Sequence, residues 1–313
     1  MAWPSPISWP RCAARSRSAS LLSSSLLAQS TNLDLTIRHV LAGLGHGIHA
    51  GVERGAGVEF SEYRAYTPGD EWRRVDWKLL ARADRYYVRE AERDSHLAVW
   101  LVLDATASMM EPSRSIEGLD KIGYARAVLA CIGAIAQRQG DAFGLVVLCD
   151  GRAQCTPAAR GPRQLHRILA QLRKAQPTGQ LPDAAALRAA LHFTRSPSLV
   201  FAASDFLDWP SPLSEALLRL RHMRHDVRAL LLQTQAEVDA DFTRGAAYRD
   251  PEAGDHVHGF DPAMQSAYIA ARDTHFGAVQ AHSRQHDVPM LAARIERAPG
   301  EVLRALLRQA GRR

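Results

Sequence analysis

The stretch HLAVWLVLDATASM, residues 96–109, decides the fold of this chain. Its first nine residues form a nearly continuous apolar run that ends at Asp104. Such a run is typical of a β-strand that is covered by helices on both faces, as in a parallel sheet. The stretch therefore predicts an α/β fold, in which Asp104 and the residues after it lie at the end of a central strand.

Strand-like and helix-like segments alternate after this stretch. Three more apolar runs indicate buried strands, and a fourth indicates a last strand: AFGLVVLCD (142–150), SLVFAASDF (198–206), DVRALLLQT (226–234) and VPMLAARIE (288–296). Helical periodicity is found between them, for example in KIGYARAVLACIGAIAQRQ (121–139), which stops at Gly140. This order predicts a doubly wound, mostly parallel sheet with helices on both faces.

The chain is divided into four parts. Residues 1–32 contain arginines and serines but no acid, which indicates a disordered extension, a leader or a start codon assigned too early. Residues 33–95 are predicted to form a helix and then a small β-rich and helical segment, called the collar, that precedes the main domain. Residues 96–235 carry the main α/β domain, and residues 236–313 a helical part that completes it.

Composition limits the compartment and the class of protein. The 313 residues carry a formal charge of +6 and four cysteines, none of them in a CxxC motif or at zinc spacing. Free thiols fit a reduced, cytoplasmic setting. No apolar run reaches the roughly 18 residues that a membrane-spanning helix needs, so no transmembrane segment is predicted.

The segment YRAYTPGDEWRRVDWKLLARADRYYVRE, residues 63–90, is dense in aromatics, arginines and acids. Aromatics and arginines together suit a nucleic-acid surface, but the acids between residues 59 and 94 cancel most of the arginine charge. We therefore predict no nucleic-acid partner. The segment is interpreted as a collar with internal arginine–carboxylate pairs, in which two strands flank a short helix and Trp72, Arg73 and Trp77 are available to a protein partner.

Polar side chains follow two of the predicted strands. Asp104, Thr106 and Ser108 come at the end of the first, and Ser204 and Asp205 at the end of the strand 198–206. Ligands of doubly wound sheets bind beyond the carboxyl ends of the strands. Oxygen donors with room for water suit Mg²⁺ or Mn²⁺, so Asp104, Thr106, Ser108 and Asp205 form a predicted metal site.

These residues also carry a family resemblance. LVLDATASM resembles the DxSxS motif of von Willebrand factor A-type domains, whose metal-ion-dependent adhesion site uses these side chains. GVEFSEYRAYTPGDEWRRVDWKLLAR, residues 57–82, resembles the signature of the domain-of-unknown-function 58 family, in which such a motif precedes an A-like domain. The pattern departs at Leu181, which stands where the resemblance implies a threonine ligand, with Thr178 and Asp183 nearby as substitutes. The implied Mg²⁺ or Mn²⁺ site is thus incomplete.

The resemblance implies a non-catalytic protein-interaction module that works with a MoxR-type AAA+ ATPase in protein assembly or maturation. The alternative is a metal-dependent hydrolase or nuclease that uses Asp104 and Asp205. A haloacid-dehalogenase mechanism needs a second carboxylate at the position of Thr106, and the chain has no GxSxG, Walker or HExxH motif. We therefore predict that the protein is not an enzyme.

Overall fold

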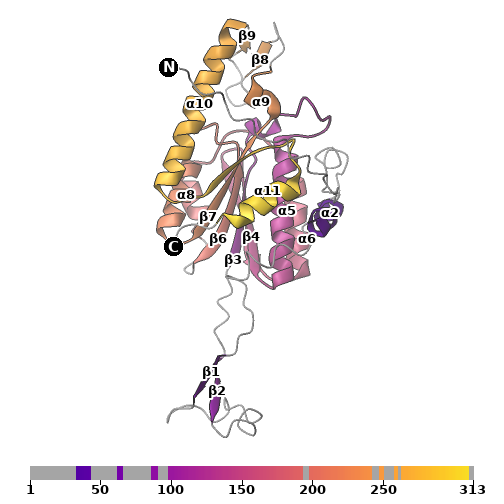
Figure 1. Cartoon of the computed structure of the whole chain (residues 1–313), viewed down its shortest axis with the longest axis vertical. Coiled ribbons are helices and arrows are strands. Elements are labelled where there is room, and N and C mark those ends of the chain that lie inside the picture. The colour runs from indigo at the N-terminus through magenta and orange to yellow at the C-terminus, as the bar shows by residue number, and fades with distance from the viewer. Residues whose placement is uncertain are drawn as a thin grey trace, which may run out of the picture.

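A six-stranded mixed sheet forms the centre of the molecule (Figure 1). The computed structural model describes residues 33–43, 62–65, 86–90, 98–192, 197–241, 247–249, 257–259 and 262–309. The strands, in their order across the sheet, are β10 (Met290–Arg294), β7 (Asp226–Gln233), β6 (Ser198–Ser204), β3 (Ala98–Asp104), β4 (Ala142–Cys149) and β5 (Arg152–Ala159). Neighbours are parallel, except that β5 runs antiparallel to β4. The predicted doubly wound, mostly parallel sheet is confirmed.

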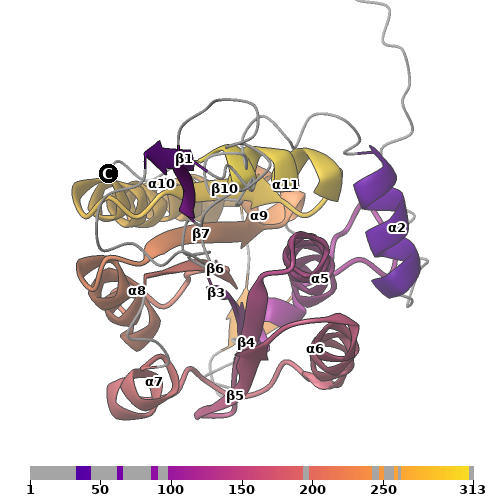
Figure 2. The ribbon, with the colours of Figure 1, turned by 90° about the horizontal axis from the view of Figure 1, so that it is seen from below.

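Helices cover both faces of the sheet (Figure 2). Successive residues of β3 point to opposite faces, so that Leu101 and Leu103 join one apolar cluster while Trp100 and Val102 join the other. The helices that bury side chains in the first cluster are α2 (Leu33–Gly43), α5 (Lys121–Gln139), α6 (Pro162–Lys174) and α11 (Pro299–Arg308). Those of the second cluster are α7 (Ala184–Ala190), α8 (Pro212–His222) and α10 (Pro262–Gln285). The strand is apolar along its length because its alternate residues are buried in two separate cores, one on each face of the sheet.

Helix α5 is the most buried helix beside β3, and its ends are set by local sequence. The side chain of Asp120 caps its start by accepting a hydrogen bond from the backbone N–H of Gly123 at 2.7 Å. Gly140 ends it with a positive φ of 76°, a conformation that costs little for glycine. The Asp120 cap fixes the position of the next residue, Lys121, which is important for the site described below.

Strand β5 was not predicted from the sequence. It lies at the edge of the sheet, and its side chains are mostly exposed or half-buried, so it has no apolar run or regular alternation. It also contains Pro157, which is acceptable on an edge strand. The buried side chain of Gln164 in α6 connects this edge to the sheet, because its amide donates to the carbonyl oxygens of Phe143 and Pro157 at 2.8 Å each.

Two small antiparallel hairpins lie outside the main sheet. Strands β1 (Glu62–Ala65) and β2 (Tyr87–Glu90) lie where two strands were predicted in the collar segment, and they pair with each other. They form a two-stranded sheet of their own, drawn apart from the main sheet in Figure 1. The predicted helix between them lies outside the described residues, and the role of the collar stays a prediction. The other hairpin pairs β8 (Ala247–Arg249) with β9 (Val257–Gly259).

The C-terminal part supplies the sheet with its edge strand β10, which pairs with β7. Two short helices lie at the carboxyl ends of the strands: the 3₁₀ helix η2 (Ala107–Met110) after β3, and α9 (Gln235–Asp239) after β7. Across the ranges that the structure describes, no helix combines the length and the apolar character that a membrane crossing requires.

Candidate functional site

The candidate site lies at the carboxyl edge of the sheet, where β3 and β6 end side by side. The two strands pair in parallel register, with Leu103 opposite Ala203. The residues that follow, Asp104 and Ser204, therefore meet, and the Ser204 hydroxyl donates to Asp104 Oδ2 at 2.6 Å. The structure thus brings together polar groups that the sequence placed at two separate strand ends.

The turn after β3 directs further donors at Asp104. The backbone N–H of Thr106 donates to Asp104 Oδ1 at 3.0 Å, and its hydroxyl donates to the same oxygen at 2.8 Å. The hydroxyl of Ser108 lies 3.2 Å from that of Thr106. The Asp104 carboxylate, only 2% exposed, therefore accepts three hydrogen bonds from Thr106 and Ser204. Hydrogen bonds of this kind stabilise a carboxylate that has lost its hydration.

These bonds do not fully compensate the burial of Asp104. Burial and the negative charge of Asp205 together raise the pKa of Asp104, the hydrogen bonds from Ser204 and Thr106 lower it, and the net result is a pKa of about 7. A fraction of the molecules therefore carries a proton on this carboxyl group near neutral pH.

A buried lysine that the sequence analysis missed lies at the same edge. Lys121, the first residue of α5, is 1% exposed, and its ammonium contacts Asp205 Oδ2 at 3.1 Å and Glu237 Oε1 at 2.6 Å. Burial acts to lower the pKa of Lys121, but the two carboxylates raise it, and the net shift is upward. The lysine therefore stays protonated at every physiological pH and offsets part of the negative charge at the edge.

Glu237 is held in place for this contact by its position in α9. Its second carboxylate oxygen, Oε2, accepts from the backbone N–H of Thr234 at 2.6 Å and from the Thr234 hydroxyl at 3.0 Å. The Thr234 hydroxyl in turn accepts from the backbone N–H of Glu237, which completes a capping box. The carboxylate of Glu237 is thus fixed by the helix start on one side and by Lys121 on the other.

The residues at this edge do not fit a complete divalent-ion site. Leu181 packs against the apolar cluster of one sheet face and offers no oxygen. Asp183 caps α7, because its Oδ1 accepts from the backbone N–H of Ala186 at 2.7 Å. The exposed hydroxyl of Thr178 faces the carbonyl oxygen of Gln176 at 3.5 Å. Neither predicted substitute for the missing ligand is therefore in a donor position.

The carboxylate of Asp205 is already engaged within the chain. Its Oδ2 contacts Lys121, and its Oδ1 accepts from the backbone N–H of Leu207 at 3.4 Å. In the part of the chain that the structure describes, no three His, Cys, Asp or Glu side chains group as metal ligands. A Mg²⁺ or Mn²⁺ ion at Asp104, Thr106, Ser108 and Asp205 stays a prediction, with a donor set short of the pattern that suggested it.

A clamped loop, residues 176–180, borders this edge. The backbone N–H of Thr178 donates to the carbonyl of Ala105 at 3.0 Å, and the N–H of Asp150 donates to the carbonyl of Thr178 at 2.8 Å. The loop thus bridges the end of β3 and the β4–β5 turn. Gly179 permits this approach, because its φ is +62° and a Cβ there would lie 2.7 Å from Asp150 Cα.

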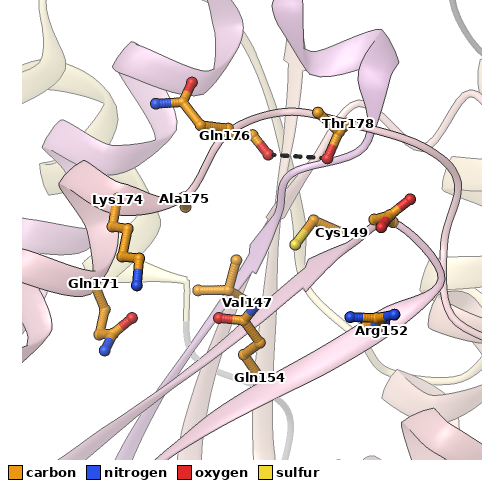
Figure 3. A pocket seen from close by; sticks show the side chains of 10 residues that line it. Val147, Cys149, Arg152, Gln154, Gln171, Lys174, Ala175, Gln176 and Thr178 are labelled. Atoms are coloured by element: carbon orange, nitrogen blue, oxygen red, sulfur yellow. Dashed lines mark hydrogen bonds between the residues drawn. The ribbon is translucent and has the colours of Figure 1, made fainter.

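The clamped loop forms one wall of a recess of about 280 Å³ between β4, β5 and the end of α6 (Figure 3). Figure 3 shows the side chains of Lys174 and Arg152 on opposite sides of this recess, with Cys149 and Gln154 between them. Both cations are exposed. Among the described residues no salt bridge involves either of them, and the one acid that lines the recess, Asp150, offsets only one of the two positive charges.

Two histidines of the described residues contact backbone groups. His225 accepts a hydrogen bond from the backbone N–H of Ser198 at 3.1 Å, and His275 contacts the carbonyl of Phe206 at 2.9 Å, so both serve the fold. Burial raises the pKa of the thiols of Cys131, Cys149 and Cys155, which opposes formation of a thiolate nucleophile.

The predicted partner-binding residues Trp72, Arg73 and Trp77 lie outside the described residues. Their role stays a prediction.

Comparison with known proteins identifies the family. A family model described as "Protein of unknown function DUF58" matches residues 62–275. Uncharacterised proteins of Mycobacterium bovis and Mycobacterium tuberculosis are each 30% identical to this chain over 280 residues, which covers 87% of this chain and 86% of each relative.

Two solved structures that are similar to this chain are BatB and the SpRpn10 VWA domain. BatB from Bacteroides thetaiotaomicron shares 13% identity with a TM-score of 0.42, over 68% of this chain and 100% of that one. The SpRpn10 VWA domain shares 10% identity with a TM-score of 0.41, over 67% of this chain and 94% of that one. The match of the family model across residues 62–275, together with the mycobacterial relatives, shows that this chain belongs to the DUF58 family.

Proposed function

We propose that this chain is a non-catalytic protein-interaction module that binds a partner protein at the carboxyl edge of its sheet. The observation that carries the proposal is the recess beside the site. It places Arg152 and Lys174, neither paired with an acid among the described residues, around one cavity that is open to solvent. Its wall is rigid, because the loop 176–180 is hydrogen-bonded to two strand ends.

The chemistry of this recess suits an acidic segment of the partner. Arginine and lysine bind carboxylates through charge-assisted hydrogen bonds, and arginine can bind one in a bidentate manner. Gln154 and Gln171 add amide donors and acceptors for a peptide backbone. We therefore infer that an aspartate or glutamate side chain of the partner enters between Lys174 and Arg152.

The partner that we propose is a MoxR-type AAA+ ATPase, following the resemblance of the sequence to its family. The ATPase would supply the energy for assembly or maturation of a client, since no Walker motif is present in this sequence. We also propose a second contact surface for the ATPase, formed by Trp72, Arg73 and Trp77. A cytoplasmic location is also part of it, and is supported by three free cysteines in the described residues.

The test is capture of a candidate ATPase by the full-length chain. Reversing both recess charges, Arg152→Glu with Lys174→Glu, is expected to weaken capture about tenfold or more, because like charges then face the acidic segment. The control on the same helix is Arg163→Glu, compared with the single variant Lys174→Glu, which changes the net charge equally. Arg163 is an exposed residue near the other end of α6, about 16 Å from Lys174 along the helix. Equal loss in the control and in the recess variant would contradict the proposed surface.

The same purified chain separates this function from the hydrolase or nuclease alternative. Hydrolysis of a phosphomonoester or phosphodiester that is abolished by Asp104→Ala would overturn the non-catalytic proposal. Retained capture of the ATPase at low salt, with a steep loss at high salt, would support an electrostatic protein contact.

A further inference from the structure

The buried ion triad of Lys121, Asp205 and Glu237 joins one residue of the predicted metal site, Asp205, to two residues outside that pattern. Its members come from three separate elements: the start of α5, the end of β6 and the helix α9. Lys121 and Asp205 are both nearly inaccessible, with side chains 1% and 4% exposed. A charged group removed from water is strongly destabilising unless an opposite charge accompanies it.

Three acids at this edge, Asp104, Asp205 and Glu237, each contact a hydrogen-bond donor or a cation within the chain. Asp104 accepts three hydrogen bonds from Thr106 and Ser204. Asp205 contacts Lys121 at 3.1 Å. Glu237 contacts Lys121 at 2.6 Å through one oxygen and Thr234 through the other. A divalent ion that took Asp205 Oδ2 as a ligand would compete with the ammonium for that oxygen, and an ion at Oδ1 would lie close to the buried positive charge of Lys121.

We propose that Lys121 is the resident cation of the carboxyl edge. Its ammonium pairs with both Asp205 and Glu237 and joins α5, β6 and α9, so that this edge folds around a cation of the chain itself and without a divalent ion. The inference concerns the cation alone and is independent of the identity of any partner. A consequence for the proposed function is that partner binding at this edge does not require Mg²⁺ or Mn²⁺. This consequence holds only if the proposed function is correct.

Direct titration of the wild-type full chain with Mn²⁺, followed by the EPR signal of the free ion, gives the first test. The proposal predicts no stoichiometric site at submillimolar Mn²⁺. One bound ion per chain with micromolar affinity would overturn it. Because this measurement uses the unmodified protein, it decides the question even if a Lys121 variant fails to fold.

Thermal unfolding of variants gives the second test. Lys121→Met keeps the apolar stem but leaves Asp205 and Glu237 without their cation, so the melting temperature is expected to fall by roughly 10 °C. Saturating Mn²⁺ is expected to restore several degrees in this variant, because the freed carboxylates then bind the ion only in the folded state. The wild type is expected to show no such shift. Lys174→Met, which removes an exposed lysine outside the triad, is the matched control and should show neither effect.

A double variant separates charge balance from packing. In Lys121→Met with Asp205→Asn the more deeply buried of the two unpaired charges is removed, so the double variant is expected to melt higher than Lys121→Met and to respond less to Mn²⁺. A Lys121→Met protein as stable as the wild type would contradict the proposal. ATPase capture that fails in wild type with or without Mn²⁺ would contradict the proposed function but leave the resident-cation inference intact.

Discussion

Replacing the buried carboxylate of Asp104 by an amide should change how the stability of the fold depends on pH. In the folded chain, burial and the charge of Asp205 raise the pKa of Asp104 from its ordinary value of 3.8 to about 7. Below 3.8 both the folded and the unfolded states hold the proton. As the pH rises, the unfolded chain releases its proton first, so stability that is present at low pH is lost as the pH passes through 7.

The magnitude follows from the two pKa values. A folded value of about 7 and an ordinary value of 3.8 give a loss of about 2.5 kcal/mol between about pH 5 and about pH 8. Asp104 is 2% exposed, so solvent screening does not reduce this figure appreciably. Asp104→Asn retains the shape of the side chain and removes the charge, so this part of the pH dependence should disappear.

The assay is urea unfolding of wild type and Asp104→Asn at both pH values. Other groups titrate in this range, so the informative quantity is the difference between the two proteins in their change of unfolding free energy. Asp183→Asn, which removes an exposed helix-capping carboxylate, controls for the change in net charge. An Asp104→Asn protein with the same pH dependence as the wild type would refute the argument that burial of this charge costs stability.

Two glycines give further predictions about the frame that holds the site. Gly144→Ala should lower the unfolding free energy by about 1–3 kcal/mol, because its Cβ would lie 2.4 Å from the Trp100 ring. Gly277→Ala in α10, where a Cβ meets nothing within 4 Å, is the control and should be neutral or slightly stabilising in the same urea experiment. Gly179→Ala should cost about 1–3 kcal/mol through its positive φ and the close approach of Asp150. It should also weaken capture of the ATPase; unchanged stability and capture would show that the loop 176–180 tolerates movement.

The sequence was sufficient to predict the central strands, because their apolar runs reflect burial on both faces. Leu101 and Val102 of β3 are fully buried on opposite faces, and no amphipathic alternation interrupts them. Strand β5 was not predicted, because its side chains are not buried on both faces. It gains its place from backbone pairing with β4 and has little apolar side-chain burial to reveal it.

The candidate site was predictable only in part. Asp104, Thr106 and Ser108 are neighbours in sequence, and the parallel register of β3 and β6 made their approach to Ser204 and Asp205 foreseeable. The triad of Lys121 was not foreseeable, because its contacts join residues 84 and 116 positions apart. A lysine at the first position of a helix is ordinarily exposed. Lys121 is buried because the segments that follow β6 and β7 bring Asp205 and Glu237 against it.

The most direct test of the resident-cation account is a crystal structure of the full chain grown with Mn²⁺, with anomalous scattering used to locate the ion. The account predicts the Lys121 ammonium within hydrogen-bonding distance of Asp205 and Glu237, and no anomalous peak among Asp104, Ser108 and Asp205. An ion coordinated by Asp104 and Ser108, with Lys121 turned away from Asp205, would contradict it.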